Sequence, residues 1–253
     1  MKLPTSGHFW LFGAFRVGTN RFHDLVRQNS TDPDPGSVNR SFFEKLCTLP
    51  KDEFETYVRN NLDKTLVYKV HDNYDRLKMV IESYPHVKIF QYRKSIREQL
   101  LSHKSSTLMQ KYHWQIPQPN KRRAPWYDSK AIPLVNESLI YKSDAFEWLE
   151  QNKHTLKEDT IDNDIVEGIY LDWLRFLNCY EESKEKKNTY TMQLEELQSN
   201  PQKYFTNIEL STVISPATIR ENTTISISDD YTMKFKEIVV RAQSMGLDVE
   251  DEF

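Results

Sequence analysis

Three groups of residues in this chain have the types and spacing to bind and transform an anionic substrate. The first is Phe15-Arg16-Val17-Gly18-Thr19-Asn20, which lies between a short apolar run, 9–12, and an amphipathic segment that begins at Arg21. In a strand–loop–helix unit of a parallel α/β fold, loop N–H groups and the helix N-terminus point at one place that favours a phosphate. An ordinary strand-to-helix turn has the same pattern, so this segment alone leaves both interpretations open.

The loop differs from the ATP- or GTP-binding P-loop, whose second glycine is followed by Lys and then by Ser or Thr. Gly13 and Gly18 have the glycine spacing, but Thr19 stands at the Lys position and Asn20 at the position of the metal-binding hydroxyl. A nucleotide or metabolite kinase needs both missing groups for a nucleotide bound with Mg²⁺. The sequence of this loop therefore argues against a nucleotide or metabolite kinase.

The second group is Lys69 and His71, at the carboxyl end of a strand predicted over 65–70. Ligands of open α/β sheets bind at this end of the strands. A histidine there can act as a general base near neutral pH, and the lysine can neutralise developing charge. The chain has seven histidines, and a lone histidine is more often structural.

The third group is Arg93 and Lys94, at the end of a strand predicted over 87–92, with Ser102 in the helix that follows. Two cations and a hydroxyl can hold a second phosphate. The alternative is a solvated basic patch on the surface.

These residues need a parallel sheet to bring them together, and the rest of the chain predicts one. Strands predicted over 9–12, 65–70, 87–92 and 189–194 alternate with segments of helical pattern. We expect helices over 21–27, 40–46, 51–61, 74–84, 95–111, 144–157, 162–182, 201–208 and 231–245. Ser95 with Glu98 three residues later is typical of a helix start. The pattern indicates an α/β fold with a central, mainly parallel sheet and helices on both faces.

Taken together, the motifs resemble those of the sulfotransferases that use 3′-phosphoadenosine 5′-phosphosulfate (PAPS). Residues 15–21 occupy the place of that family's P-K-S-G-T-T-W loop, and Lys69-Val70-His71 matches its K-T-H strand end. Lys94 and Ser102 have the eight-residue spacing of its 3′-phosphate motif, with Arg93 as a second basic residue. Residues 190–197, followed by Pro201, are similar to its late Y-E-D-L element.

The resemblance implies a single α/β domain of the P-loop nucleoside-triphosphate-hydrolase type over 1–253, with a loop insertion at 115–137. It implies sulfuryl transfer from PAPS to a hydroxyl or amine of an acceptor such as a carbohydrate or small metabolite, with 3′,5′-adenosine bisphosphate as product. A sulfuryl group carries less negative charge than a phosphoryl group, so we expect no required metal. A non-catalytic nucleotide-binding protein of the same fold remains an alternative beside the kinase.

The resemblance also assigns roles to the residues. Arg16 and Lys69 would stabilise charge on the leaving group, and His71 would take the acceptor's proton. The donor would be held by Arg16, Val17, Gly18, Thr19, Asn20, Arg21, Arg93, Lys94 and Ser102. The chain departs from the family at Arg16, where Lys is usual, and lacks an R-K-G-x-x-G element near its C-terminus, for which Arg220 is a candidate substitute.

The bulk composition excludes several other classes. A net charge of -3 and a pI near 6.2 give no basic excess that would attract nucleic acid. The apolar runs are too short to span a bilayer, and the two cysteines lie far apart in the sequence. We therefore expect a cytoplasmic protein with reduced thiols and no membrane span.

Overall fold

The computed structural model describes residues 2–14, 17–32, 49–70, 82, 86–103, 163–206, 208 and 225–252. The helices predicted over 40–46 and 144–157, the helix predicted over 74–84 apart from residue 82, and the insertion at 115–137 lie outside the described residues.

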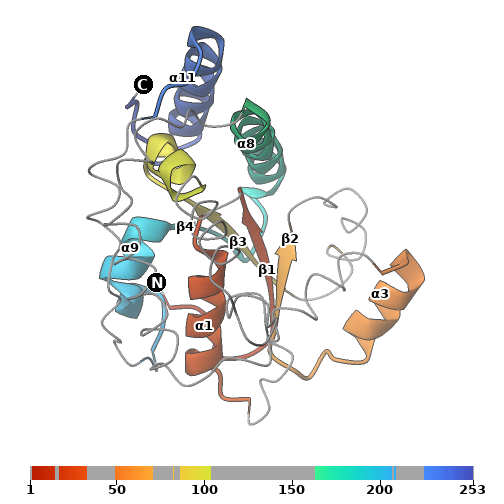
Figure 1. Ribbon diagram of the computed structural model, residues 1–253. Helices are drawn as coiled ribbons and strands as arrows, with labels where there is room; N and C mark the ends of the chain where they lie inside the picture. The colour runs from red at the N-terminus through yellow and green to blue at the C-terminus, as the bar shows by residue number, and fades with distance from the viewer. Residues whose placement is uncertain are drawn as a thin grey trace, which may run out of the picture.

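Four parallel strands form one sheet in the order β2-β1-β3-β4 (Figure 1). They are β1 (His8–Gly13), β2 (Leu66–Val70), β3 (Val87–Tyr92) and β4 (Thr189–Gln193). Each agrees with its predicted range to within one residue at either end. Every residue of β1 and β3 is buried, as expected for parallel strands that have helices on both faces.

Helices cover both faces of this sheet, as the sequence predicted. On one face, the ring centroid of Phe9 lies 6.3 Å from that of Phe22 in α1 (Thr19–Asn29). On the other, Phe12 stacks on Phe90, and Phe90 meets Phe176 of α8 (Asn163–Ser183) with ring centroids 5.8 Å apart. The alternation of side chains along a strand places Phe9 and Phe12 on opposite faces. The described residues thus form an α/β sandwich around one aromatic core.

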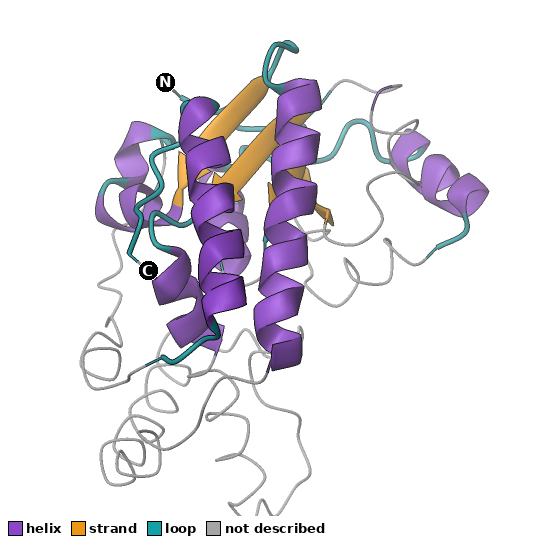
Figure 2. Cartoon of the chain, turned by 90° about the horizontal axis from the view of Figure 1, so that it is seen from above, coloured by secondary structure: helices purple, strands orange, loops and turns teal. Residues whose placement is uncertain are grey.

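A second helix lies over α8. This is α11 (Asp229–Ser244), which begins at the N-cap Ser228 and ends just before Gly246. Figure 2 shows the two long helices side by side in front of the sheet, and the rings of Tyr170 and Phe235 meet between them. The helix α3 (Lys51–Arg59) precedes β2 and ends two residues earlier than predicted.

The region after β4 corrects one prediction. A helix was expected over 201–208, but α9 (Leu194–Ser199) begins directly after the strand and only a single 3₁₀ turn, η2 (Pro201–Lys203), follows it. Pro201 has no N–H to continue the bonding of α9, and Asn200 adopts a non-helical backbone with φ -141°. Leu194 and Leu197, three residues apart, anchor α9 in the core.

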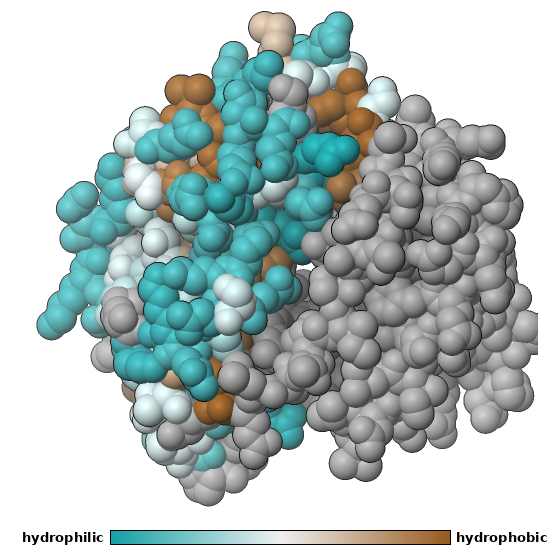
Figure 3. Space-filling model, turned by 90° about the vertical axis from the view of Figure 1, so that its left-hand side faces the viewer, coloured by the Kyte–Doolittle hydropathy of each residue, from teal (hydrophilic) through white to brown (hydrophobic). Residues whose placement is uncertain are grey.

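One face of the described part of the molecule is largely polar. Figure 3 views the side on which α9 lies in Figure 1, and there hydrophobic side chains form separate small groups among hydrophilic ones. Among the described helices, none combines the length and apolar character needed to cross a membrane.

Candidate functional site

The parallel register brings the three sequence motifs to one edge of the sheet. Phe12 of the central strand pairs with Val70 on one side and with Phe90 on the other, and Gly13 pairs with Gln91. The loop after β1, the end of β2 and the end of β3 therefore leave the sheet at the same edge. Lys69 is part of β2, whereas Arg16 and His71 lie outside the described residues.

The loop between β1 and α1 has a glycine at each end, and at each position a Cβ would collide with neighbouring atoms. A Cβ on Gly13 would lie 2.7 Å from Cγ2 of Val17 and 3.0 Å from the carbonyl oxygen of Gln91. Gly18 has φ +78°, and a Cβ there would lie 2.3 Å from Cδ1 of Leu194. The two glycines are thus packed closely, Gly13 against β3 and Gly18 against α9.

The start of α1 is a helix N-terminus with unsatisfied donors. The first helical bond runs from the Phe22 N–H to the Gly18 carbonyl at 3.3 Å, so the N–H groups of Thr19, Asn20 and Arg21 have no acceptor within the helix. Gly18 is the N-cap, no side chain caps the helix, and its first turn holds no acidic residue. A helix start of this kind favours an anion through its N–H groups and its dipole.

A buried side chain that the sequence pattern did not indicate supports this loop from below. Gln91 in β3 is fully buried, and its Nε2 donates to the carbonyl oxygen of Val17 at 2.7 Å. The other amide atom, Oε1, is buried without a hydrogen-bond partner among the described residues. The available signal was that Gln91, with Lys88, interrupts an otherwise apolar strand.

The two cations at the end of β3 differ in exposure: Arg93 is buried and faces a carboxylate of α9, whereas the Lys94 side chain is partly exposed. Arg93 is buried, and its Nη1 lies 3.9 Å from Oε1 of Glu195. The Lys94 N–H donates to Oε2 of the same Glu195 at 3.1 Å. Ser102 is buried in the helical segment 96–103, which starts at Ser95 as predicted, since the Ser95 Oγ accepts from the Glu98 N–H at 3.0 Å.

A segment after α11 covers the same place, and this was not predicted. In residues 247–252, which we call the C-terminal strap, Leu247 and Val249 are buried, and the Glu250 N–H donates to the Lys94 carbonyl at 2.8 Å. The Glu250 carboxylate lies 2.5 Å from Lys94 Nζ, and their hydrogen bond raises the pKa of Lys94 and lowers that of Glu250.

Further polar contacts hold the strap in place. The Ser95 hydroxyl donates to Glu252, the Asp248 N–H donates to the Tyr92 hydroxyl at 3.3 Å, and Gln193 Nε2 donates to the Asp248 carbonyl at 3.1 Å. The strap therefore presents carboxylates to Lys94 and Ser95, close to the end of β3.

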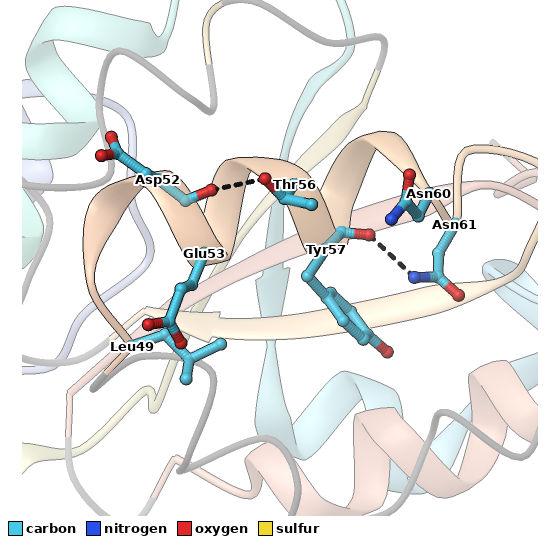
Figure 4. A pocket seen from close by; sticks show the side chains of 7 residues that line it. All are labelled: Leu49, Asp52, Glu53, Thr56, Tyr57, Asn60 and Asn61. Atoms are coloured by element: carbon cyan, nitrogen blue, oxygen red, sulfur yellow. Dashed lines mark hydrogen bonds between the residues drawn. The ribbon is translucent and has the colours of Figure 1, made fainter.

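A hollow of about 450 Å³ lies elsewhere, along α3 (Figure 4). The described residues that line it are Leu49, Asp52, Glu53, Thr56, Tyr57, Asn60 and Asn61. The Asn61 carbonyl accepts from Nε2 of His8, the first residue of β1, at 2.7 Å. This end of the hollow is thus near the amino edge of the sheet, opposite the edge that collects the motifs.

Comparisons with known proteins give a distant structural similarity. No protein-family model matches the chain, and no curated protein matches it. The solved structure of a sulfotransferase domain from the curacin biosynthetic pathway is similar at a TM-score of 0.38 and 12% identity, over 99% of this chain and 100% of that one. Values this low establish neither a common family nor a common chemistry.

Proposed function

We propose that the chain is a sulfotransferase that moves a sulfuryl group from PAPS to a hydroxyl or amine of an acceptor, on an α/β fold of the P-loop type. The observation that carries the proposal is the start of α1. It offers free N–H groups and no carboxylate to an anion at the carboxyl edge of a parallel sheet. Thr19 and Asn20 stand where a kinase needs Lys and a metal-binding hydroxyl, which favours the less charged sulfuryl group.

The residues at this edge fit the two anionic ends of the donor. The 5′-phosphosulfate would lie on the N–H groups of residues 18–21, where the helix dipole favours negative charge. The 3′-phosphate would lie against Arg93, Lys94 and Ser102, which follow β3. Because Lys94 is paired with Glu250, this phosphate must compete with a carboxylate.

The proposed transfer is an in-line displacement at sulfur. The acceptor oxygen forms a bond to sulfur, the bond from sulfur to the bridging oxygen breaks, and 3′,5′-adenosine bisphosphate leaves with the electron pair. His71 takes the acceptor's proton, while Arg16 and Lys69 stabilise negative charge on the bridging oxygen. The His71→Ala variant should lose about a hundredfold to ten-thousandfold in rate. Near-full sulfuryl transfer by this variant would remove His71 from the mechanism.

Ligand binding tests the proposal without knowledge of the acceptor. We expect 3′,5′-adenosine bisphosphate without metal to raise the thermal midpoint, and ATP with Mg²⁺ to leave it unchanged. A ligand present at 100 times its Kd adds about 2.7 kcal/mol to the free energy of unfolding. Adenosine 5′-monophosphate is the matched control, because it lacks only the 3′-phosphate. Stabilisation by ATP with Mg²⁺ alone would support the kinase, and equal stabilisation by the two adenylates would remove the 3′-phosphate site.

A further inference from the structure

We infer that Gln91 is the positioning residue of the anion-binding loop: by holding the Val17 carbonyl, it aims the Gly18 N–H at the donor. This inference rests on the proposed function. Gln91 touches neither the donor nor the reacting atoms, and it acts through the Val17–Gly18 peptide.

The geometry of one peptide group carries the inference. Gln91 lies in β3 opposite Gly13, fully buried, and its Nε2 donates to the Val17 carbonyl oxygen at 2.7 Å. The Val17–Gly18 peptide is trans, so its C=O and N–H point in opposite directions. A carbonyl held toward the sheet therefore turns the Gly18 N–H away from the sheet. No hydrogen bond joins that N–H to another described residue.

The energetics of the site point away from a purely structural role. The Oε1 atom of Gln91 is buried without a partner among the described residues, which costs free energy that an apolar side chain of the same length would not incur. Methionine has that length and would fill the same space in β3. Core packing alone therefore does not call for glutamine, whereas fixing the Val17 carbonyl does.

The wild-type protein provides the first test, which is independent of any folding defect. In an amide NMR titration with 3′,5′-adenosine bisphosphate, the Gly18 amide proton should move downfield as it donates to the anion. A Gly18 signal that stays in place while those of residues 19–21 move would overturn the inference.

Two variants provide the second test. Gln91→Met removes the donor without adding charge. Its thermal midpoint should change little, because the cost of the unpartnered Oε1 disappears while the buried Val17 carbonyl loses its donor. Its affinity for the bisphosphate should fall about ten- to a hundredfold, the range for one hydrogen bond to a charged group. A purely structural glutamine would give the reverse result, a lower midpoint with unchanged affinity.

Gln91→Glu adds a pH signature. Its carboxylate cannot donate to the Val17 carbonyl, but its protonated form can. The ratio of wild-type to variant affinity should therefore fall as the pH is lowered. If the wild type binds the bisphosphate and Gln91→Met binds it equally tightly, the inference is overturned and the proposed function stands. Absence of wild-type binding would refute the proposed function, and the inference with it.

Discussion

Replacement of Gly18 by Ala should destabilise the protein through two separable effects. Gly18 has φ +78°, in the left-handed region, where a residue with a Cβ costs about 1–2 kcal/mol. The new Cβ would also lie 2.3 Å from Cδ1 and 3.1 Å from Cδ2 of Leu194. Leu194 is 1% exposed, so its methyl groups have no free space to enter. Overpacking of this kind costs about 1–3 kcal/mol, for a total of about 2–5 kcal/mol.

Gly246 provides a matched control for the backbone effect. It has φ +82°, and a Cβ there would meet nothing within 4 Å. The Gly246→Ala variant should therefore lose only the backbone contribution of about 1–2 kcal/mol. The difference between the two variants then measures the contact between Gly18 and Leu194.

Urea unfolding followed by far-ultraviolet circular dichroism measures both free energies. A double-mutant cycle with Leu194→Ala isolates the contact, since truncation of Leu194 makes room for the new methyl group. We expect the double variant to be more stable than the sum of the single effects by about 1–3 kcal/mol. Equal losses for Gly18→Ala and Gly246→Ala, together with an additive cycle, would refute the close packing of the loop against α9.

Two further predictions concern charge. Glu250→Gln should tighten binding of 3′,5′-adenosine bisphosphate up to about fivefold, the range for an exposed ion pair, because Lys94 loses its carboxylate partner. Calorimetric titration should show no such gain for adenosine 5′-monophosphate or for the control Asp251→Asn, and equal gains for both variants would indicate net charge alone. Burial lowers the pKa of His8 below its usual 6.5, so the unfolded chain takes up the proton first and stability falls as the pH drops below 6.5. Urea unfolding measures the free energy of unfolding at pH values between 6.5 and 5. This free energy should fall less steeply with decreasing pH for His8→Gln than for the wild type, and an equal pH dependence would contradict the role given to His8.

The strands were predictable because their signal is local. The run 87–92 is apolar except for Lys88 and Gln91, and the structure buries every residue of it. Parallel pairing then places the ends of β1, β2 and β3 at one edge, so that motifs far apart in the sequence come together. Local patterns thus determined both the fold class and the edge that carries the candidate site.

The contacts that complete the site were not predictable in the same way. The ion pairs Arg93–Glu195 and Lys94–Glu250 join residues more than 100 positions apart, and no periodicity marks such pairs. The hydrogen bond from Gln91 to Val17 and the contact of Gly18 with Leu194 also depend on tertiary packing. The strap had one usable signal after Gly246: buried Leu247 and Val249 alternate with acidic Asp248 and Glu250, which is the pattern of an extended segment with one buried side.

The two ends of the proposed donor meet different electrostatic conditions, and this difference bears on selectivity. At the start of α1, N–H groups without acceptors in the helix would gain a hydrogen bond from a bound anion, so a 5′-phosphate would bind there at little cost to the contacts of the described residues. At the end of β3, the Glu250 carboxylate is already paired with Lys94, and a 3′-phosphate would bind only as far as it outcompetes that carboxylate. A phosphate carries more charge than a carboxylate and has three acceptor oxygens. The end of β3 would therefore admit a phosphate and reject weaker anions, so it contributes more to discrimination than to affinity.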